Sequence, residues 1–172
     1  VIDVSKGFDK QDRNIINYVI DKGKGLIIVL NKWDLIEKDN YTLKNIQDDI
    51  IDSYPMLAYF PMLFISVKNN LRVRDVLKNA RQVYYERQRM LKTNELNVFL
   101  EKIIHQYQPP SVNGKFLKIK YMTQLAGSPP LFALYCNHPH LFNVNYKRYI
   151  ENQLRKTFGL LGTPIRISFR KK

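Results

Sequence analysis

Residues 26–34 read LIIVLNKWD, and this stretch decides the fold of the first part of the chain. Its first five residues form a short, uninterrupted apolar run, which predicts a strand buried on both faces, as in a parallel sheet. Asn31, Lys32 and Asp34 follow directly, at the carboxyl end of that strand. Open α/β sheets bind their ligands at this edge, so the stretch predicts a binding site there.

The pattern N-K-x-D at this place resembles the guanine-reading motif of P-loop GTPases. The resemblance implies that Asp34 accepts hydrogen bonds from the ring N–H and the amino group of guanine. It also implies that Asn31 meets the opposite edge of the base and that the stem of Lys32 lies across its plane. A base without those donors would strand a buried carboxylate and bind roughly 10⁴-fold more weakly. The alternative is a polar turn, because Asn and Asp are common turn residues.

The first 92 residues repeat the order strand, then helix. Apolar strands are predicted at 1–4, 26–30 and 62–65, and an amphipathic helical pattern follows each of them. This order predicts a parallel α/β layer with right-handed crossovers. It corresponds to half of a P-loop GTPase sheet, so we expect residues 1–92 to be the C-terminal part of a GTP-binding domain.

A second loop, Ser66-Val67-Lys68, follows the predicted strand at 62–65. It resembles the guanine-contacting S-A-K loop of GTPases, whose backbone N–H meets the guanine carbonyl. Val67 stands where the family usually has Ala, and a backbone donor does not depend on that side chain. The resemblance therefore assigns Ser66, Val67 and Lys68 to the guanine pocket, together with Asn31, Lys32 and Asp34.

Several parts of a complete GTPase have no counterpart in this sequence. It contains no P-loop G-x-x-x-x-G-K-[ST], and Lys6 stands where the D-x-x-G motif would need Gly after Asp3. Nothing in these residues would cradle the β- and γ-phosphates or hold Mg²⁺. We therefore expect a fragment that does not hydrolyse GTP alone, with GTP or GDP and Mg²⁺ bound by the intact parent.

The residues from 93 to 172 predict a second, smaller domain of the α+β class. Helical spacing at 96–104 is followed by strands at 116–121 and 131–136, a helix near 145–158 and a strand at 164–170. This α-β-β-α-β order predicts a three-stranded sheet with helices on one face.

Positive charge is concentrated in this second part. The chain has a formal net charge of +13, and residues 93–172 contribute twelve Lys and Arg against three Glu. Such a field attracts polyanions, and nucleic acid is the usual one. The alternatives are a charge that serves general solubility and a domain that mainly docks protein, including the other domains of its chain. The candidate RNA-binding residues are Lys118, Lys120, Lys147, Arg148, Arg155, Lys156 and Arg170.

Six stretches together make the resemblance specific: VIDVSKGFDKQD, NKWDL, KIKYMTQ, PPLFALYCN, YKRYIENQLR and GTPIRI. They are similar to the Der (EngA) family, bacterial GTPases with two tandem GTP-binding domains and a C-terminal KH-like domain. The resemblance implies the second half of the second GTP-binding domain plus the KH-like domain. It also implies a role in large ribosomal subunit assembly, with guanine nucleotide, ribosomal RNA and the missing GTP-binding domains as partners.

Some conspicuous patterns favour structure over binding. Gly159 and Gly162 have the G-x-x-G spacing of a KH nucleic-acid loop, but two Leu lie between them, so a helix cap and turn is the better interpretation. The strand aromatics are interpreted as core more readily than as a base-stacking platform. They are Tyr121, Phe132, Tyr135 and Phe169.

The composition also bears on where the protein works. No stretch approaches the roughly 18 apolar residues that span a bilayer, and no signal peptide is present, so we expect no membrane partner. The single Cys136 excludes an internal disulfide and fits a reducing compartment. We therefore expect a cytoplasmic protein.

Overall fold

A computed structural model of the protein describes residues 1–37, 39, 41–112 and 114–171. The chain folds into two compact units: unit 1 comprises residues 1–87 and 160–164, and unit 2 comprises residues 88–159 and the chain from 165 onward. The predicted domain boundary after residue 92 lies in the short segment between helix α3, which ends at Gln88, and helix α4, which begins at Thr93.

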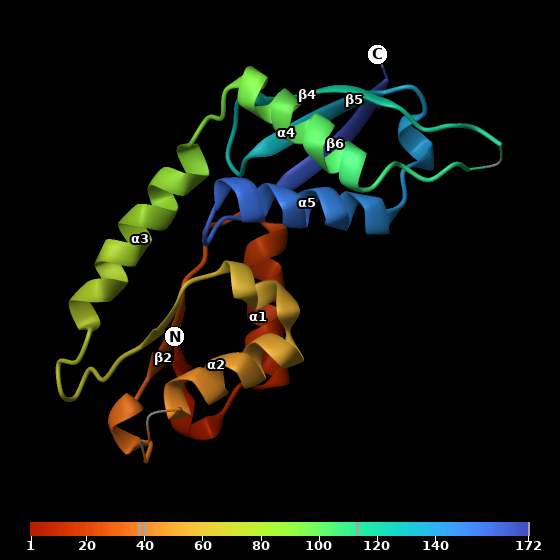
Figure 1. The fold of residues 1–172 in the computed structure, drawn as a ribbon. Coiled ribbons are helices and arrows are strands. Elements are labelled where there is room, and N and C mark those ends of the chain that lie inside the picture. Colours follow the sequence, from red (N-terminus) through yellow and green to blue (C-terminus); the bar gives the residue numbers. More distant parts are fainter. Residues whose placement is uncertain (38, 40, 113, 172) are drawn as a thin grey trace. The chain divides into compact units, whose positions relative to one another are not determined.

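Unit 1 is a parallel three-stranded sheet with helices, which confirms the predicted α/β half-domain. The strand order is β1-β2-β3, with Ile2 of β1 paired to Leu30 of β2 and Leu30 paired to Phe64 of β3. Helices α1 and α2 form the crossovers, and short 3-10 helices lie at Val4–Lys6, Trp33–Leu35 and Pro55–Tyr59. The elements are β1 (Ile2–Asp3), α1 (Lys10–Asp21), β2 (Ile28–Asn31), α2 (Thr42–Ser53), β3 (Met62–Phe64) and α3 (Val73–Gln88) (Figure 1).

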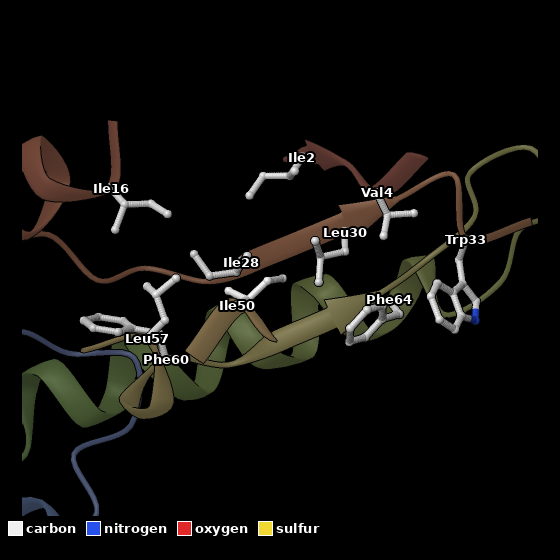
Figure 2. Packing of buried hydrophobic residues seen from close by; sticks show 10 residues of the cluster. All are labelled: Ile2, Val4, Ile16, Ile28, Leu30, Trp33, Ile50, Leu57, Phe60 and Phe64. Atoms are coloured by element: carbon white, nitrogen blue, oxygen red, sulfur yellow. The ribbon is translucent and has the colours of Figure 1, made fainter. Parts of the chain in front are cut away.

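The core of unit 1 reaches into the predicted guanine motif. Apolar side chains from the three strands pack with residues of α1, α2 and the turn after α2 (Figure 2). Trp33, the variable position of N-K-x-D, is buried and meets Phe64 at a ring-centroid distance of 4.8 Å. Burying a large aromatic side chain contributes several kcal/mol at most and fixes the loop around it, so Trp33 anchors the motif to the sheet.

Residues 160–164 belong to unit 1, although they lie between two elements of unit 2 in the sequence. The N–H of Leu26 donates to the carbonyl of Gly162 (2.9 Å), and the N–H of Gly162 donates to the carbonyl of Tyr59 (2.8 Å). Leu160 and Thr163 are fully buried. Gly159 ends helix α5 as predicted, with its N–H bonded to the carbonyl of Arg155 (2.9 Å). The G-x-x-G stretch is thus a helix end followed by a packed segment.

Unit 2 has the predicted α-β-β-α-β order and a three-stranded sheet, in the order β4-β5-β6. Strands β4 and β5 are antiparallel, and β5 and β6 are parallel. The two helices lie on the same side of the sheet (Figure 1). The elements are α4 (Thr93–Gln106), β4 (Ile119–Leu125), β5 (Leu131–Cys136), α5 (Val144–Phe158) and β6 (Arg166–Lys171), with a short 3-10 helix at Pro139–Leu141.

A bulge in β4 changes which side chains share a face. Ile119 pairs with Cys136 and Tyr121 pairs with Tyr135, with a register shift between them. Leu117 and Ile119 are buried, and Lys118 and Lys120 are exposed, as the alternation predicts. The expectation that Tyr121 shares the buried face with Ile119 is wrong, because the extra residue of the bulge turns Tyr121 to the other face.

Asn97 of α4 protects the outer edge of β4. Its Oδ1 accepts from the N–H of Met122 (2.9 Å), and its Nδ2 donates to the carbonyl of Met122 (3.0 Å). These two groups lie on the edge strand, where unpaired backbone invites pairing with another chain. The amide of Asn97 thus replaces a missing neighbouring strand at this position.

We expect Asn97→Ala to lower the free energy of unfolding of unit 2 by about 1–3 kcal/mol, since it leaves both backbone groups of Met122 without this partner. Urea unfolding measures the effect. Asn94→Ala, at an exposed position on the same helix, is the matched control because both substitutions raise helix propensity alike. Equal unfolding midpoints for the two variants would show that Asn97 contributes nothing at the edge.

Candidate functional site

The loops that follow β2 and β3 meet at the carboxyl edge of the unit 1 sheet. The N–H of Trp33 donates to the carbonyl of Ile65 (3.0 Å), which ties the two loops together through backbone. Two side-chain bonds add to this: Ser66 Oγ donates to Asp34 Oδ1 (2.5 Å), and the N–H of Val67 donates to Asn31 Oδ1 (3.2 Å). Residues more than thirty positions apart therefore form one local arrangement.

Ser66 is the centre of this arrangement. Its side chain is fully buried, and its Oγ both donates to Asp34 and accepts from the N–H of Asn69 (3.1 Å). Its backbone bonds Leu71 in both directions (3.2 and 2.9 Å), which closes a tight loop over residues 66–71. A buried hydroxyl with a donor and an acceptor partner has one fixed orientation, so Ser66 also fixes the carboxylate of Asp34.

Lys32 has a conformation that is uncommon for a residue other than glycine. Its φ is +66°, in the left-handed region, and its Nζ lies 2.7 Å from Asp3 Oδ2. The hydrogen bond from Lys32, with a second from Ser5, lowers the pKa of Asp3 to about 2. Asp3 is therefore a charged partner of Lys32 at neutral pH and stands beside it because β1 pairs with β2 in the register Asp3–Asn31.

The structure places the predicted guanine-site residues on the same sheet edge. Asn31 and Asp34 are partly buried, and the side chains of Lys32, Val67 and Lys68 are exposed. The arrangement offers an oriented carboxylate, a side-chain amide and an exposed ammonium stem, which suit a flat heterocycle with donors on one edge.

Three further residues of this site carry roles that the pattern of N-K-x-D and S-V-K did not assign: Trp33 as anchor, Asn69 as partner of Ser66, and Asp3 as partner of Lys32. Only Asp3 had a usable signal, because a polar residue that ends a neighbouring parallel strand arrives at the same edge. Within the residues described, no group of three His, Cys, Asp or Glu side chains could hold a metal ion. In the same residues, no helix has the length and apolarity of a bilayer span.

The predicted RNA-binding residues divide between two surfaces of unit 2. Lys118, Lys120 and Arg170 are exposed on the sheet, and Lys147, Arg148 and Lys156 are exposed on α5, which covers the other side (Figure 1). The prediction that Arg155 is exposed is wrong, because its side chain is only 3% exposed and its Nη2 lies 3.1 Å from Glu151 Oε1. Its charge is therefore paired inside unit 2.

Two family models match the chain. The model of the elongation factor Tu GTP-binding domain matches residues 1–107. The model described as the KH-domain-like, C-terminal domain of EngA bacterial GTPase enzymes matches residues 90–170. Together they extend across nearly the whole sequence and agree with the two kinds of fold seen in the two units.

Curated relatives align with the whole chain. GTPase Der from Chlorobium phaeobacteroides is 41% identical over 172 residues, which are 100% of this chain and 40% of the relative. GTPase Der from Lactobacillus johnsonii gives the same identity and the same coverage. The chain therefore spans about 40% of the length of the curated relatives that it matches.

Among solved structures, a variant of Era from Aquifex aeolicus bound to GDP.AlF4- aligns with 99% of this chain and 63% of its own, at 15% identity and a TM-score of 0.41. The family assignment rests on the two family models and on relatives that are 41% identical to the chain over its 172 residues. On these matches, the chain belongs to the Der (EngA) family of GTPases, of which it contains GTP-binding-domain sequence followed by the KH-like domain.

Proposed function

We propose that residues 1–92 read the guanine base for a GTPase that acts in assembly of the large ribosomal subunit. The observation that carries this proposal is the pair of bonds from Ser66 to Asp34 and from Val67 to Asn31, since they hold the two candidate base-reading loops together. The residues assigned to the base are Asn31, Lys32, Asp34, Ser66, Val67 and Lys68.

Each group has a distinct part in the proposed recognition. Asp34, oriented by Ser66, accepts from N1–H and the 2-amino group of guanine, which adenine does not offer as a pair. Asn31 approaches the opposite edge of the base, and the stem of Lys32 covers one of its faces while Nζ stays with Asp3. Because Asp3 and Ser66 hold these side chains in place, little ordering entropy is lost on binding.

Phosphate and Mg²⁺ contacts are assigned to other residues of the whole protein, since this sequence holds no P-loop motif. We therefore propose hydrolysis of GTP for the whole protein and not for this chain alone. The test of base reading is competition of labelled GDP by XDP in the whole protein, with and without Asp34→Asn. Unchanged selectivity would remove Asp34 from the guanine site.

We further propose that residues 93–172 bind ribosomal RNA, chiefly through phosphates. The support is their excess of twelve basic over three acidic side chains, with Lys118, Lys120 and Arg170 exposed on the sheet and Lys147, Arg148 and Lys156 on α5. Counterion release drives such binding and makes it depend on salt. A module of this size engages roughly three to five phosphates on single strands by this reasoning.

The expected result is micromolar binding of unrelated RNA oligomers by the 172-residue chain, with log K falling against log salt at a slope of about −2 to −4. Fluorescence anisotropy at several salt concentrations measures the slope. Replacing Lys118 and Lys120 by Ala should flatten it by about one to two, whereas Lys78→Ala on α3 should leave it unchanged. A flat salt dependence in the wild type would contradict phosphate binding.

The second candidate function is domain docking by the KH-like part. A groove of about 410 Å³ lies between α4 and α5 and is lined by Val98, Phe99, Ile103 and Phe158, among others. Val98 is exposed there. Another domain of the same protein would cover this groove through apolar contact, and such docking would persist at salt concentrations that remove RNA.

A further inference from the structure

Phe116 presents an aromatic ring to solvent from a fixed backbone. Its exposed fraction is 82%, compared with 54% for Tyr107 of the same unit. Asn137 holds the backbone that follows the ring: Nδ2 donates to the carbonyl of Phe116 (2.7 Å), and Oδ1 accepts from the N–H of Lys118 (2.9 Å). The carbonyl of Lys118 in turn accepts from the N–H of Asn137 (3.2 Å). These hydrogen bonds fix the backbone at Phe116 relative to the end of strand β5.

The strand register brings two more rings to the same end. Tyr121 pairs with Tyr135, and Tyr135 pairs with Arg170, so one row crosses all three strands. The rings of Tyr121 and Tyr135 stack, with centroids 4.5 Å apart and an angle of 14° between their planes. Both side chains are partly exposed. The bulge in β4 is what turns Tyr121 to this face, because without it the period of two would bury that ring.

Three cationic side chains lie on the same face as these rings. Lys118 and Lys120 alternate with the buried Leu117 and Ile119, so they share the exposed face with Phe116, and Arg170 is exposed at the end of the row. The acidic side chains of residues 93–172 are Glu95, Glu101 and Glu151. All three belong to α4 and α5, which lie on the other side of the sheet (Figure 1).

We infer that this aromatic-basic face, formed by Phe116, Lys118, Lys120, Tyr121, Tyr135 and Arg170, binds single-stranded RNA with an unpaired base stacked on Phe116. The inference rests on the RNA binding proposed above. It adds the surface that binds the RNA and a preference for single strands over duplexes. Sites that bind single strands combine cations that follow the backbone with aromatic rings that stack bases, and every base has a face to stack. A duplex keeps its bases stacked internally, so it offers phosphates and ribose hydroxyls but no free base face to the ring.

RNA fits this face better than a protein partner does. Phe116 alternates with Lys118 and Lys120 along one extended segment, so a ligand that covers the ring also meets the two ammonium groups. A polyanion whose charges and flat apolar groups alternate at short intervals matches that spacing of ring and cation. A protein partner would bury the same cations and would need a matching acid for each.

The test compares Phe116→Ala with the wild-type 172-residue chain, using a fluorescein-labelled octamer of adenosine and an RNA duplex of equal length. We expect the variant to bind the single strand roughly 5- to 150-fold more weakly and the duplex within about twofold of wild type. Tyr18→Ala is the matched control, since Tyr18 is an exposed aromatic (64%) of helix α1 in unit 1. It should leave both affinities unchanged.

Phe116→Leu and Phe116→Trp separate stacking from general apolar contact. Stacking predicts that the Leu variant loses affinity nearly as the Ala variant does, whereas the Trp variant retains it. In the Trp variant, bound bases should also quench the emission of the introduced indole, which is distinguishable from the buried Trp33 by its solvent-exposed spectrum. Urea midpoints equal to wild type show that each variant is folded.

The outcomes distinguish RNA binding by residues 93–172 from base stacking on Phe116. If the wild type binds no RNA at low salt, the proposed RNA function fails and this inference fails with it. If it binds RNA but Phe116→Ala leaves the single-strand affinity unchanged, the RNA function stands and the platform is overturned. Full affinity in the Leu variant would likewise overturn stacking and would assign Phe116 to apolar docking of a protein.

Discussion

Asp34→Asn in the whole protein is expected to weaken GDP roughly 10- to 150-fold and to make XDP the preferred ligand. In the proposed site the carboxylate accepts from two donors of guanine, whereas the amide keeps one acceptor and turns an N–H toward the 2-position. Guanine then meets donor against donor, whereas the 2-oxo group of xanthine accepts. A lost hydrogen bond to a charged group costs about 1.5–3 kcal/mol, which gives the quoted range in affinity.

The hydrogen bond from Ser66 allows Asp34→Asn to change the hydrogen-bonding groups without changing the orientation of the side chain. Ser66 Oγ donates to Asp34 Oδ1 at 2.5 Å, and the carbonyl oxygen of Asn can accept the same bond. The side chain therefore keeps its orientation while one acceptor becomes a donor. Binding of XDP by the variant would itself show that the loop remains folded.

Two control variants define the result. Asp48→Asn removes the same charge from an exposed position on α2 and should leave the preference for GDP unchanged. Asp34→Ala removes the acceptors without adding a donor, so it should lose GDP without gaining XDP. A gain of XDP binding in Asp34→Ala would mean that selectivity arises elsewhere in the pocket.

The sequence could predict the two loops of this site but not how they hold each other. A polar residue at or just after the end of an apolar strand lies at the carboxyl edge of the sheet, and this holds for Asn31, which ends β2, and for Ser66, which follows β3 by two residues. The bond between Ser66 and Asp34 depends on the exact path of both loops in three dimensions. No periodicity encodes it, and the buried anchor Trp33 lies at a motif position that the pattern leaves variable.

In unit 2 the order of elements was predictable, and details of register and burial were not. A bulge adds one residue to one strand, so the alternation before Tyr121 gives no warning that the ring turns to the opposite face. Arg155 follows the buried Leu154 and lies four residues after Glu151 on α5. Its burial depends on that pairing, whereas a single Arg in a basic helix is usually exposed.

The role of Gly162 was also hidden, because the G-x-x-G spacing suggested only a choice between an RNA loop and a turn. The structure places residues 160–164 in unit 1, where Gly162 bonds both Leu26 and Tyr59 through its backbone. A Cβ at residue 162 would lie 2.3 Å from Cγ2 of Val83 and 3.1 Å from the carbonyl oxygen of Leu26. Val83 also lies against Gly25, so two glycines make room for one branched side chain.

Gly162→Ala is therefore expected to lower the free energy of unfolding of unit 1 by about 2–5 kcal/mol. The φ of +70° costs an L-residue about 1–2 kcal/mol, and forcing a methyl group into a packed site costs about 1–3 kcal/mol. Val83 cannot readily turn away, since a branched side chain in a helix has one strongly preferred rotamer. Urea unfolding measures the loss, and hydrogen exchange at the Leu26 amide shows whether its bond to Gly162 opens.

Gly159→Ala is the matched control, because Gly159 also has a positive φ (+80°) but its added Cβ would meet nothing within 4 Å. It carries a conformational cost and should leave exchange at Leu26 unchanged. A double-mutant cycle with Val83→Ala then isolates the steric part: removing the Val83 methyls should recover about 1–3 kcal/mol of the loss from Gly162→Ala. If the losses of unfolding free energy in Gly162→Ala and Val83→Ala simply add, the contact with Val83 does not restrict which side chain fits at residue 162. The requirement for glycine there would then come from φ alone.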